Sequence, residues 1–110
     1  MPISYALAQV QGTAAVGTYA TLYSTGASES AIISTIGICN TASTAVTYRV
    51  GVSASAGTPT ASEWIVYDNT VPANDTVFLT VGLTMQASRF LRISSSASTC
   101  AFSASYALNT

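Results

Sequence analysis

Side chains that could carry acid–base or metal chemistry are scarce in this 110-residue chain. It has three Arg, four carboxylates and two Cys, and it contains no His and no Lys. Without His it lacks the commonest general base and the commonest metal ligand in proteins. All four carboxylates fall in predicted turns or at strand ends: Glu29, Glu63, Asp68 and Asp75. We therefore predict a protein that is not an enzyme, with no catalytic residue, metal or cofactor.

Two chemical alternatives use these carboxylates. A pair of them could hydrolyse a glycosidic bond, and Asp68-Asn69 with Asn74-Asp75 could offer oxygens to Ca²⁺. Calcium requires six to eight oxygens, several of them from carboxylates, and these two turns supply only two carboxylates. Asp and Asn in turns usually bond the neighbouring backbone, so turn capping is the interpretation we favour.

The two cysteines differ in phase. The apolar alternation of Ile32 and Ile36 places Cys39 on the opposite face of its strand, whereas Cys100 is in phase with Phe102. This pattern predicts two free thiols that pack as small apolar side chains. A disulfide is the alternative if a bulge resets one of the strands.

The low charge of the chain indicates how it meets partners. Only 6% of the residues are charged, against about a quarter in ordinary soluble domains. A surface of hydroxyl and methyl groups favours contacts through packing and backbone pairing. This is typical of a subunit of a larger assembly, and we expect a homo-oligomer.

Composition also argues against some partners and locations. The net charge is −1 and three Arg are the only cations, so we expect no binding to nucleic acid, which needs clustered positive charge. No apolar run approaches the roughly 20 residues of a membrane span. The first residues lack the basic segment of a secretory signal, which favours a cytosolic protein.

Period-two alternation runs through most of the chain and predicts β-strands. In residues 44–53, Val46, Tyr48 and Val50 alternate with polar or small residues, and 75–83 repeats the pattern. Further strands are predicted at 17–24, 31–40, 63–68, 89–95 and 99–108. No segment has a helical period, although residues 61–63 could form a single turn.

The strands and the turns between them predict an all-β fold. We expect a two-layer antiparallel β-sandwich of about seven or eight strands, jelly-roll or Ig-like, with a small β-barrel as the alternative. One domain would span residues 17–110. Residues 1–16 would form an N-terminal strand of the same sheet or an arm that pairs with a neighbouring subunit, with Ile3, Tyr5 and Leu7 on one side.

Five further residues are candidates for contact with partners. Phe78 interrupts the polar side of its strand, as a lid over a sheet edge or as a contact residue. Trp64 follows a polar loop, where it could meet a glycan or a protein. Arg49, Arg89 and Arg92 could pair with carboxylates of neighbouring subunits, because Arg is favoured at interfaces; a local pair with Asp68 or Glu63 is the alternative.

The order of segments resembles small virion structural proteins of tailed phages, including cyanophages. The likeness covers roughly residues 20 to 108. It rests on residues 32–40 with their Cys-Asn end, on the Thr-rich strand 44–50, on the Pro-Ala-Asn-Asp-Thr turn within 71–76, and on 22–25, 67–68 and 79–85. No catalytic residue is associated with this pattern.

The resemblance implies a non-enzymatic virion protein, assembled in the host cytoplasm, whose partners are phage capsid or other virion proteins. The predicted role is a capsid decoration or cement protein that stabilises the shell through multivalent contacts. The alternative is a tail, neck or fibre module that binds a host-surface glycan or a neighbouring tail protein.

Overall fold

The computed structural model describes residues 3–110 and contains eight β-strands and one short 3-10 helix. The strands are β1 (Ile3–Gln11), β2 (Ala20–Ser24), β3 (Ser30–Asn40), β4 (Val46–Ser53), β5 (Trp64–Val71), β6 (Thr76–Met85), β7 (Phe90–Ser95) and β8 (Cys100–Asn109). The helix η1 (Ala61–Glu63) lies where the sequence allowed a single turn.

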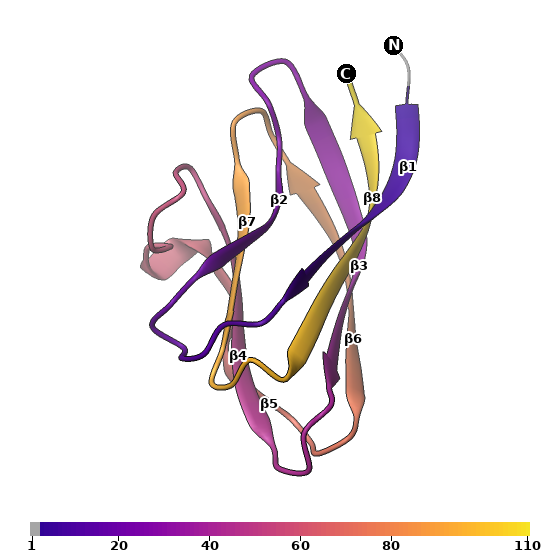
Figure 1. Ribbon diagram of the computed structural model, residues 1–110. Coiled ribbons are helices and arrows are strands. Elements are labelled where there is room, and N and C mark those ends of the chain that lie inside the picture. The colour runs from indigo at the N-terminus through magenta and orange to yellow at the C-terminus, as the bar shows by residue number, and fades with distance from the viewer. Residues whose placement is uncertain (1–2) are drawn as a thin grey trace.

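The strands form two four-stranded antiparallel sheets, with orders β1-β8-β3-β6 and β2-β7-β4-β5 (Figure 1). The pairs β1–β8, β2–β7, β3–β6 and β4–β5 are nested within one another, as in a long hairpin that has been rolled up. Nested pairing in two four-stranded sheets is the topology of an eight-stranded jelly roll. The predicted β-sandwich is therefore confirmed, and its jelly-roll form is the one observed.

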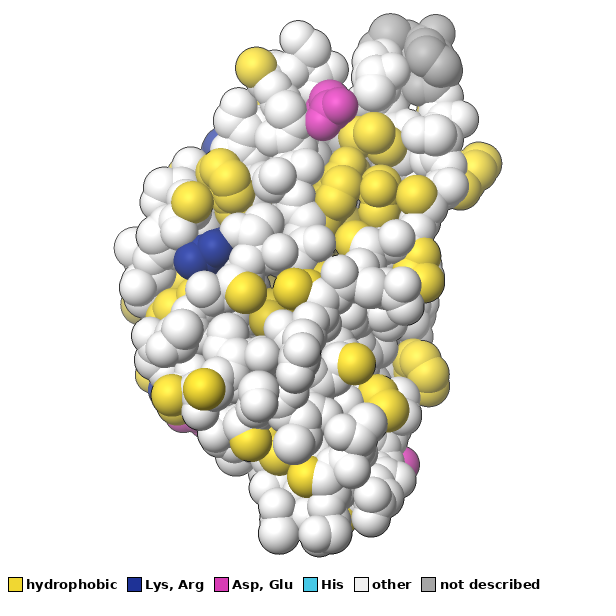
Figure 2. All heavy atoms as spheres, in the orientation of Figure 1, with side chains coloured by type: hydrophobic (Ala, Val, Ile, Leu, Met, Phe, Trp, Pro, Cys, Tyr) yellow, Lys and Arg dark blue, Asp and Glu magenta, His cyan; other side chains and the backbone are white. Residues whose placement is uncertain are grey.

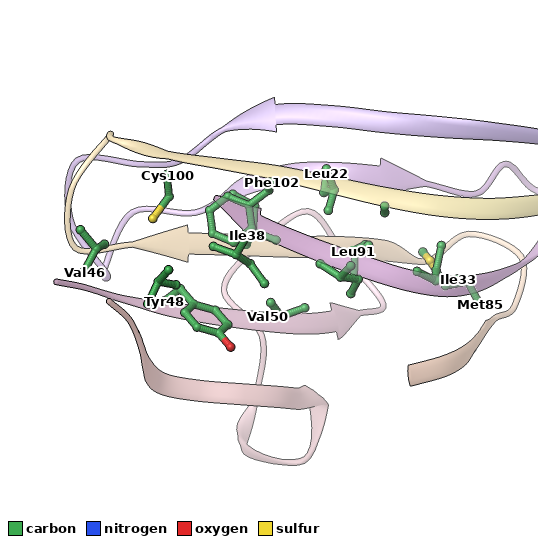
Figure 3. Packing of buried hydrophobic residues seen from close by; sticks show 14 of the residues in the cluster. Leu22, Ile33, Ile38, Val46, Tyr48, Val50, Met85, Leu91, Cys100 and Phe102 are labelled. Atoms are coloured by element: carbon green, nitrogen blue, oxygen red, sulfur yellow. The ribbon is translucent and has the colours of Figure 1, made fainter. Parts of the chain in front are cut away.

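The core lies between the two sheets (Figure 3). Val46, Tyr48 and Val50 are buried, as the alternation in residues 44–53 predicts. They face Ile38 and Phe102 of the other sheet, and the Tyr48 ring meets the Phe102 ring edge-on at 6.4 Å between centroids. Alternate residues of each strand thus supply one continuous apolar layer.

One position of the predicted core is wrong. Ile32 was expected to point inward, but its side chain is 54% exposed, while Ile33 is fully buried. The register of β3 against β6 and β8 shifts between Ile33 and Thr35, which marks a bulge. The extra residue moves Ile32 to the outer face and leaves Ile36 in its predicted inward position.

The N-terminal strand β1 pairs with β8 of the same chain, from Ile3 opposite Asn109 to Gln11 opposite Ala101, without a shift. The predicted segment 1–16 also includes residues 1 and 2, which lie outside the described residues. Gly12 ends the strand, and its N–H donates to the Cys100 carbonyl at 2.6 Å. A Cβ atom at Gly12 would collide with the Ser95 hydroxyl, so the chain passes here only because no side chain is present.

Asn40 joins three loops at one end of the sandwich. Its side chain is 1% exposed, and its amide donates to the carbonyls of Thr44 at 2.8 Å and Pro72 at 3.2 Å. Its carbonyl accepts from the Ala42 N–H at 3.0 Å and the Thr99 hydroxyl at 3.2 Å. The loops that follow β3, β5 and β7 are therefore held by one buried side chain.

No helix within residues 3–110 is long and apolar enough to cross a membrane.

Candidate interaction surfaces

The outer face of the β1-β8-β3-β6 sheet has no charge. None of its four strands contains an Asp, Glu, Lys or Arg. The seven charged residues of the chain all lie in loops, in η1 or in strands of the other sheet. We call this outer surface the uncharged face. The solvent-facing side of a β-sheet usually carries charged or polar side chains. The lack of charge therefore distinguishes the uncharged face from the rest of the molecular surface.

The uncharged face exposes large apolar side chains. Five of the seven exposed large hydrophobic residues of the described chain belong to it: Tyr5 (81% exposed), Phe78 (69%), Ile3 (58%), Ile32 (54%) and Leu7 (54%). Figure 2 shows hydrophobic side chains over the part of the surface near β1 and β8, with one acidic group directly beside them. Exposed apolar surface that gathers on one side of a monomer marks interaction sites.

Two hollows shape the uncharged face. Tyr5 and Ile32 are both aligned with Ala107 of the intervening strand, and the small Ala side chain leaves a hollow of about 310 Å³ between them. A larger trough of about 880 Å³ runs between Gln9 on β1 and Phe78 on β6. Both hollows can receive side chains from a partner.

Phe78 stands on the edge strand β6, directly across from Gly37 of β3. A Cβ atom at Gly37 would lie 3.2 Å from the Phe78 ring and 2.9 Å from the Ser103 hydroxyl. The missing side chain lets the ring lie beside the backbone of β3 and form one wall of the trough. Phe78 thus lies on an edge strand, with more than half of its surface open to contact.

Arg49 has its partners within the chain. Its guanidinium bonds both carboxylate oxygens of Asp68, at 2.6 and 3.0 Å, and the Tyr19 hydroxyl at 2.9 Å. It also lies 4.1 Å from the centre of the Tyr67 ring, a cation–π contact. The local pair with Asp68 is therefore the observed arrangement, and most of the donors of Arg49 are already used.

The Arg49–Asp68 pair perturbs both groups. The guanidinium beside Asp68 lowers the pKa of that carboxyl below its usual value, and the hydrogen bond from Arg49 is the main cause. The same bond raises the pKa of Arg49. In the neighbouring loop, hydrogen bonds from the backbone N–H groups of Thr60 and Ala54 lower the pKa of Glu63. The Asp68 and Glu63 carboxylates thus hold β5 and the loop before it in place through local hydrogen bonds.

Trp64 belongs to an aromatic cluster around Arg49. Its ring lies 5.7 Å from Tyr19 and 5.1 Å from Tyr67, and its side chain is only partly exposed. Tyr67 is 57% exposed. Trp64 is thus partly covered by its neighbours, and Tyr67 presents the more open aromatic surface.

The remaining arginines bond locally. Arg89 precedes β7, and its guanidinium donates to the carbonyls of Ala87 and Ser88 and to the Gln86 side chain at 3.3 to 3.4 Å. Arg92 lies on β7 and donates to the Thr21 hydroxyl at 2.6 Å. Neither Arg89 nor Arg92 forms a salt bridge within residues 3–110.

The cysteines lie on opposite faces of the same sheet. Asn40 is aligned with Cys100, and Cys39 with Ala101, so the two sulfurs are one residue out of phase and both thiols are free. The predicted difference in phase is confirmed. Burial raises the pKa of the Cys100 thiol, which favours its protonated form. No group of three or more His, Cys, Asp or Glu side chains within residues 3–110 could hold a metal ion.

The fold defines the class of this protein as an eight-stranded jelly roll. Among solved structures, a chain in the structure of infectious bursal disease virus, Gx strain, is similar to it, with a TM-score of 0.57 and 16% sequence identity. The similarity covers 97% of this chain and 32% of that chain, so this chain spans about a third of its structural neighbour. At this identity the likeness is one of fold. No protein-family model matches the chain, and no curated protein matches it.

Proposed function

We propose that this protein is a non-enzymatic structural component of a phage virion, and that it acts as a capsid decoration or cement protein. The uncharged face with its five exposed apolar side chains is the observation that carries the proposal. The jelly roll is a fold used in viral capsids, and the structural neighbour comes from a virus structure. Because folds host many functions, the uncharged face has more weight here than the fold.

The uncharged face suits repeated attachment to a shell. On binding, the Phe78 and Ile32 side chains would be removed from water. The two hollows would receive side chains of the shell or of neighbouring copies. Each contact is modest in area, but copies that are tied together on a lattice bind with the avidity of the whole set. Absence of charge on this face makes such contacts insensitive to salt, since little Coulomb energy is screened.

The second candidate is a tail, neck or fibre module that binds a host-surface glycan or a neighbouring tail protein. The observation in its favour is the open Tyr67 ring beside Trp64 and Arg49. A sugar ring can stack on such an aromatic surface while its hydroxyls bond the Asp68 carboxylate. Against it, Arg49 and Asp68 are already paired to each other, and Trp64 is partly covered.

Labelling of particles tests the location. An antibody to this protein should decorate the shells of virions of the phage that encodes it, as seen by electron microscopy. Virions that carry no copy would contradict the virion proposal. A signal confined to the tail, with glycan binding that Tyr67→Ala abolishes, would favour the second candidate over the first.

Reconstitution tests the proposed mechanism. Particles that lack this protein should release their genome at lower temperature, and added wild-type protein should restore the stability. Phe78→Arg should fail to restore it, because the substitution places a charge on the β6 edge of the uncharged face. Ile65→Arg places the same charge at an exposed apolar position on the other sheet. It is the control and should act like wild type.

A further inference from the structure

The free edge of β1 differs from the other sheet edges. A jelly roll of two open sheets has four edge strands, here β1, β6, β2 and β5. Natural proteins protect such edges with short strands, bulges, charges or Pro, because unpaired backbone groups invite another strand. Three of the four edges carry a device of this kind, and β1 does not.

The three protected edges are each interrupted or short. The strand β2 has five residues and a register shift. In β5, Asp68 carries a charge and has a φ of 54°, next to a shift in pairing. In β6, Gly82 has a φ of 55° where the register against β3 shifts. By contrast, β1 runs nine residues in unbroken register with no charged residue and no Pro.

The hydrogen-bond pattern fixes which groups of β1 face the open edge. Gly12 donates to the Cys100 carbonyl and continues the β1–β8 register, so the even-numbered residues form the hydrogen-bonded pairs with β8. The N–H and C=O groups of Ile3, Tyr5 and Leu7 therefore point away from β8. No strand within the described residues pairs with this side of β1.

The first half of β1, from Ile3 to Leu7, is also exposed on both faces of the sheet. All five residues from Ile3 to Leu7 are exposed, whereas Ala8 and Val10 are half-buried against the core. The odd-numbered residues of this half place both their free backbone groups at the edge and their apolar side chains on the uncharged face. A strand that pairs here would satisfy the backbone and bring its own side chains against Ile3, Tyr5 and Leu7.

We propose that the occupant is a second copy of this chain, whose β1 pairs antiparallel with β1 about a two-fold axis at Tyr5. In this register Tyr5 faces Tyr5 of the second copy, and Ile3 of each copy faces Leu7 of the other. The apolar pattern Ile-x-Tyr-x-Leu is thus complementary to itself. Because the strand has no charge, self-pairing brings no like charges together, and a two-fold contact closes without growing into a fibre.

The area of this contact sets its strength. A large side chain buries up to roughly 200 Å², so pairing that covers the flanks of Ile3, Tyr5 and Leu7 buries at most on the order of 400 Å² per copy. The total, about 800 Å², falls short of the roughly 1,200 Å² of stable complexes. We expect a dissociation constant in the range of tens to hundreds of micromolar, a contact that dissociates in dilute solution and persists on a crowded lattice. This inference deepens the proposed function, and the role of the dimer in a particle rests on it.

Sedimentation equilibrium from about 5 to 500 µM tests the dimer on the full chain. Wild-type protein should pass from monomer to dimer over this range. Tyr5→Lys should weaken association at least tenfold, because two ammonium groups would face each other at the axis. Ile65→Lys places the same charge at an exposed apolar position on β5 of the other sheet and should dimerise like wild type. A wild-type protein that stays monomeric at 500 µM, or equal weakening by both substitutions, would overturn the inference.

Cross-linking tests the register. Directly opposed residues of a hydrogen-bonded antiparallel pair have Cα atoms about 5.5 Å apart, within the range of a disulfide. In a Cys39→Ser background, Tyr5→Cys should form a dimer on oxidation. Leu7→Cys should not, because the two Leu7 positions lie roughly 14 Å apart along the strands. Efficient cross-linking of Leu7→Cys in place of Tyr5→Cys would refute the axis at Tyr5.

Separate experiments test the dimer and the virion role, so one can fail without the other. The dimer is measured on purified protein without any particle, whereas the virion role is measured by labelling and reconstitution. A monomeric protein that decorates shells through β1 would show that the strand pairs with another virion protein, which overturns self-pairing and leaves the virion proposal in place.

Discussion

Replacing Asn40 by Ala should destabilise the fold more than its single polar side chain suggests. The side chain is 1% exposed and makes four hydrogen bonds of 2.8 to 3.2 Å to groups in three loops. At about 1 kcal/mol net for each bond, the substitution costs up to about 4 kcal/mol. Because some of the released loop groups regain water, we expect a loss of about 3 kcal/mol in the free energy of unfolding.

Urea denaturation measures this loss. The midpoint should fall at an unchanged m-value, since the change in exposed surface is small, and the melting temperature should drop by roughly 12 °C. Protein concentration must be equal and low in all samples, because self-association adds apparent stability. Asn69→Ala is the matched control: Asn69 is exposed and accepts one bond, from the N–H of Thr70, so its loss should stay within about 0.5 kcal/mol.

A small effect would refute this reasoning. If Asn40→Ala lost less than about 1 kcal/mol, or no more than Asn69→Ala, the three loops would be held by their strands and not by the buried amide. A further variant, Asn40→Asp, keeps the size of the side chain and removes the donors to the Thr44 and Pro72 carbonyls. It should be at least as unstable as the Ala variant at neutral pH, because it buries a carboxylate against two carbonyl oxygens.

Three other outcomes follow from the packing and the charges. Gly12→Ala should lower the free energy of unfolding by about 1 to 3 kcal/mol in urea denaturation, because the new methyl group meets the Ser95 side chain. Gly17→Ala is the control and should be neutral or slightly stabilising, because a Cβ atom there meets nothing within 4 Å. Equal effects of the two substitutions would contradict the close approach at Gly12. Ile36→Ala empties a fully buried position and should cost about 2 to 5 kcal/mol, and a loss under 1 kcal/mol would mean that the core collapses around it. Since Arg49 lowers the pKa of Asp68, the pair stabilises the fold above about pH 4 and stops doing so as pH falls through the lowered pKa. Asp68→Asn should therefore be less stable than wild type at pH 6, and the difference should shrink as pH falls through that pKa; a difference that does not shrink in acid would refute the ion pair as the cause.

Much of the fold could be predicted from the sequence because a strand's alternation is local. The burial of Val46, Tyr48 and Val50 follows from period two alone, and so does the opposite orientation of Cys39 and Cys100. The bulge that exposes Ile32 could not be predicted, because Ile32 and Ile33 are equally apolar and either can face the core. Only pairing with β6 and β8, which are distant in the sequence, decides between them.

The candidate surface was predicted only in part. Ile3, Tyr5, Leu7 and Phe78 were candidates from their own strands, but their gathering on one uncharged face depends on the sheet order, which places β1, β8, β3 and β6 side by side. The pairing of Arg49 with Asp68 was one of two alternatives, because sequence does not fix which strand lies beside Arg49. Asn40 looked like an ordinary turn residue, since its buried partners come from loops that are far apart in the chain.

The nested pairing also orders how the chain can fold. The innermost pair, β4 with β5, closes a short loop, whereas β1 and β8 join the two ends of the molecule, with Ile3 opposite Asn109. Closing a longer loop costs more chain entropy, so each inner pair lowers the cost of the next one outward, and β1 adds last. During folding, the strand with the least protected edge is thus also the one that stays unpaired longest. The rest of the sandwich can form around β8 before β1 pairs with any strand.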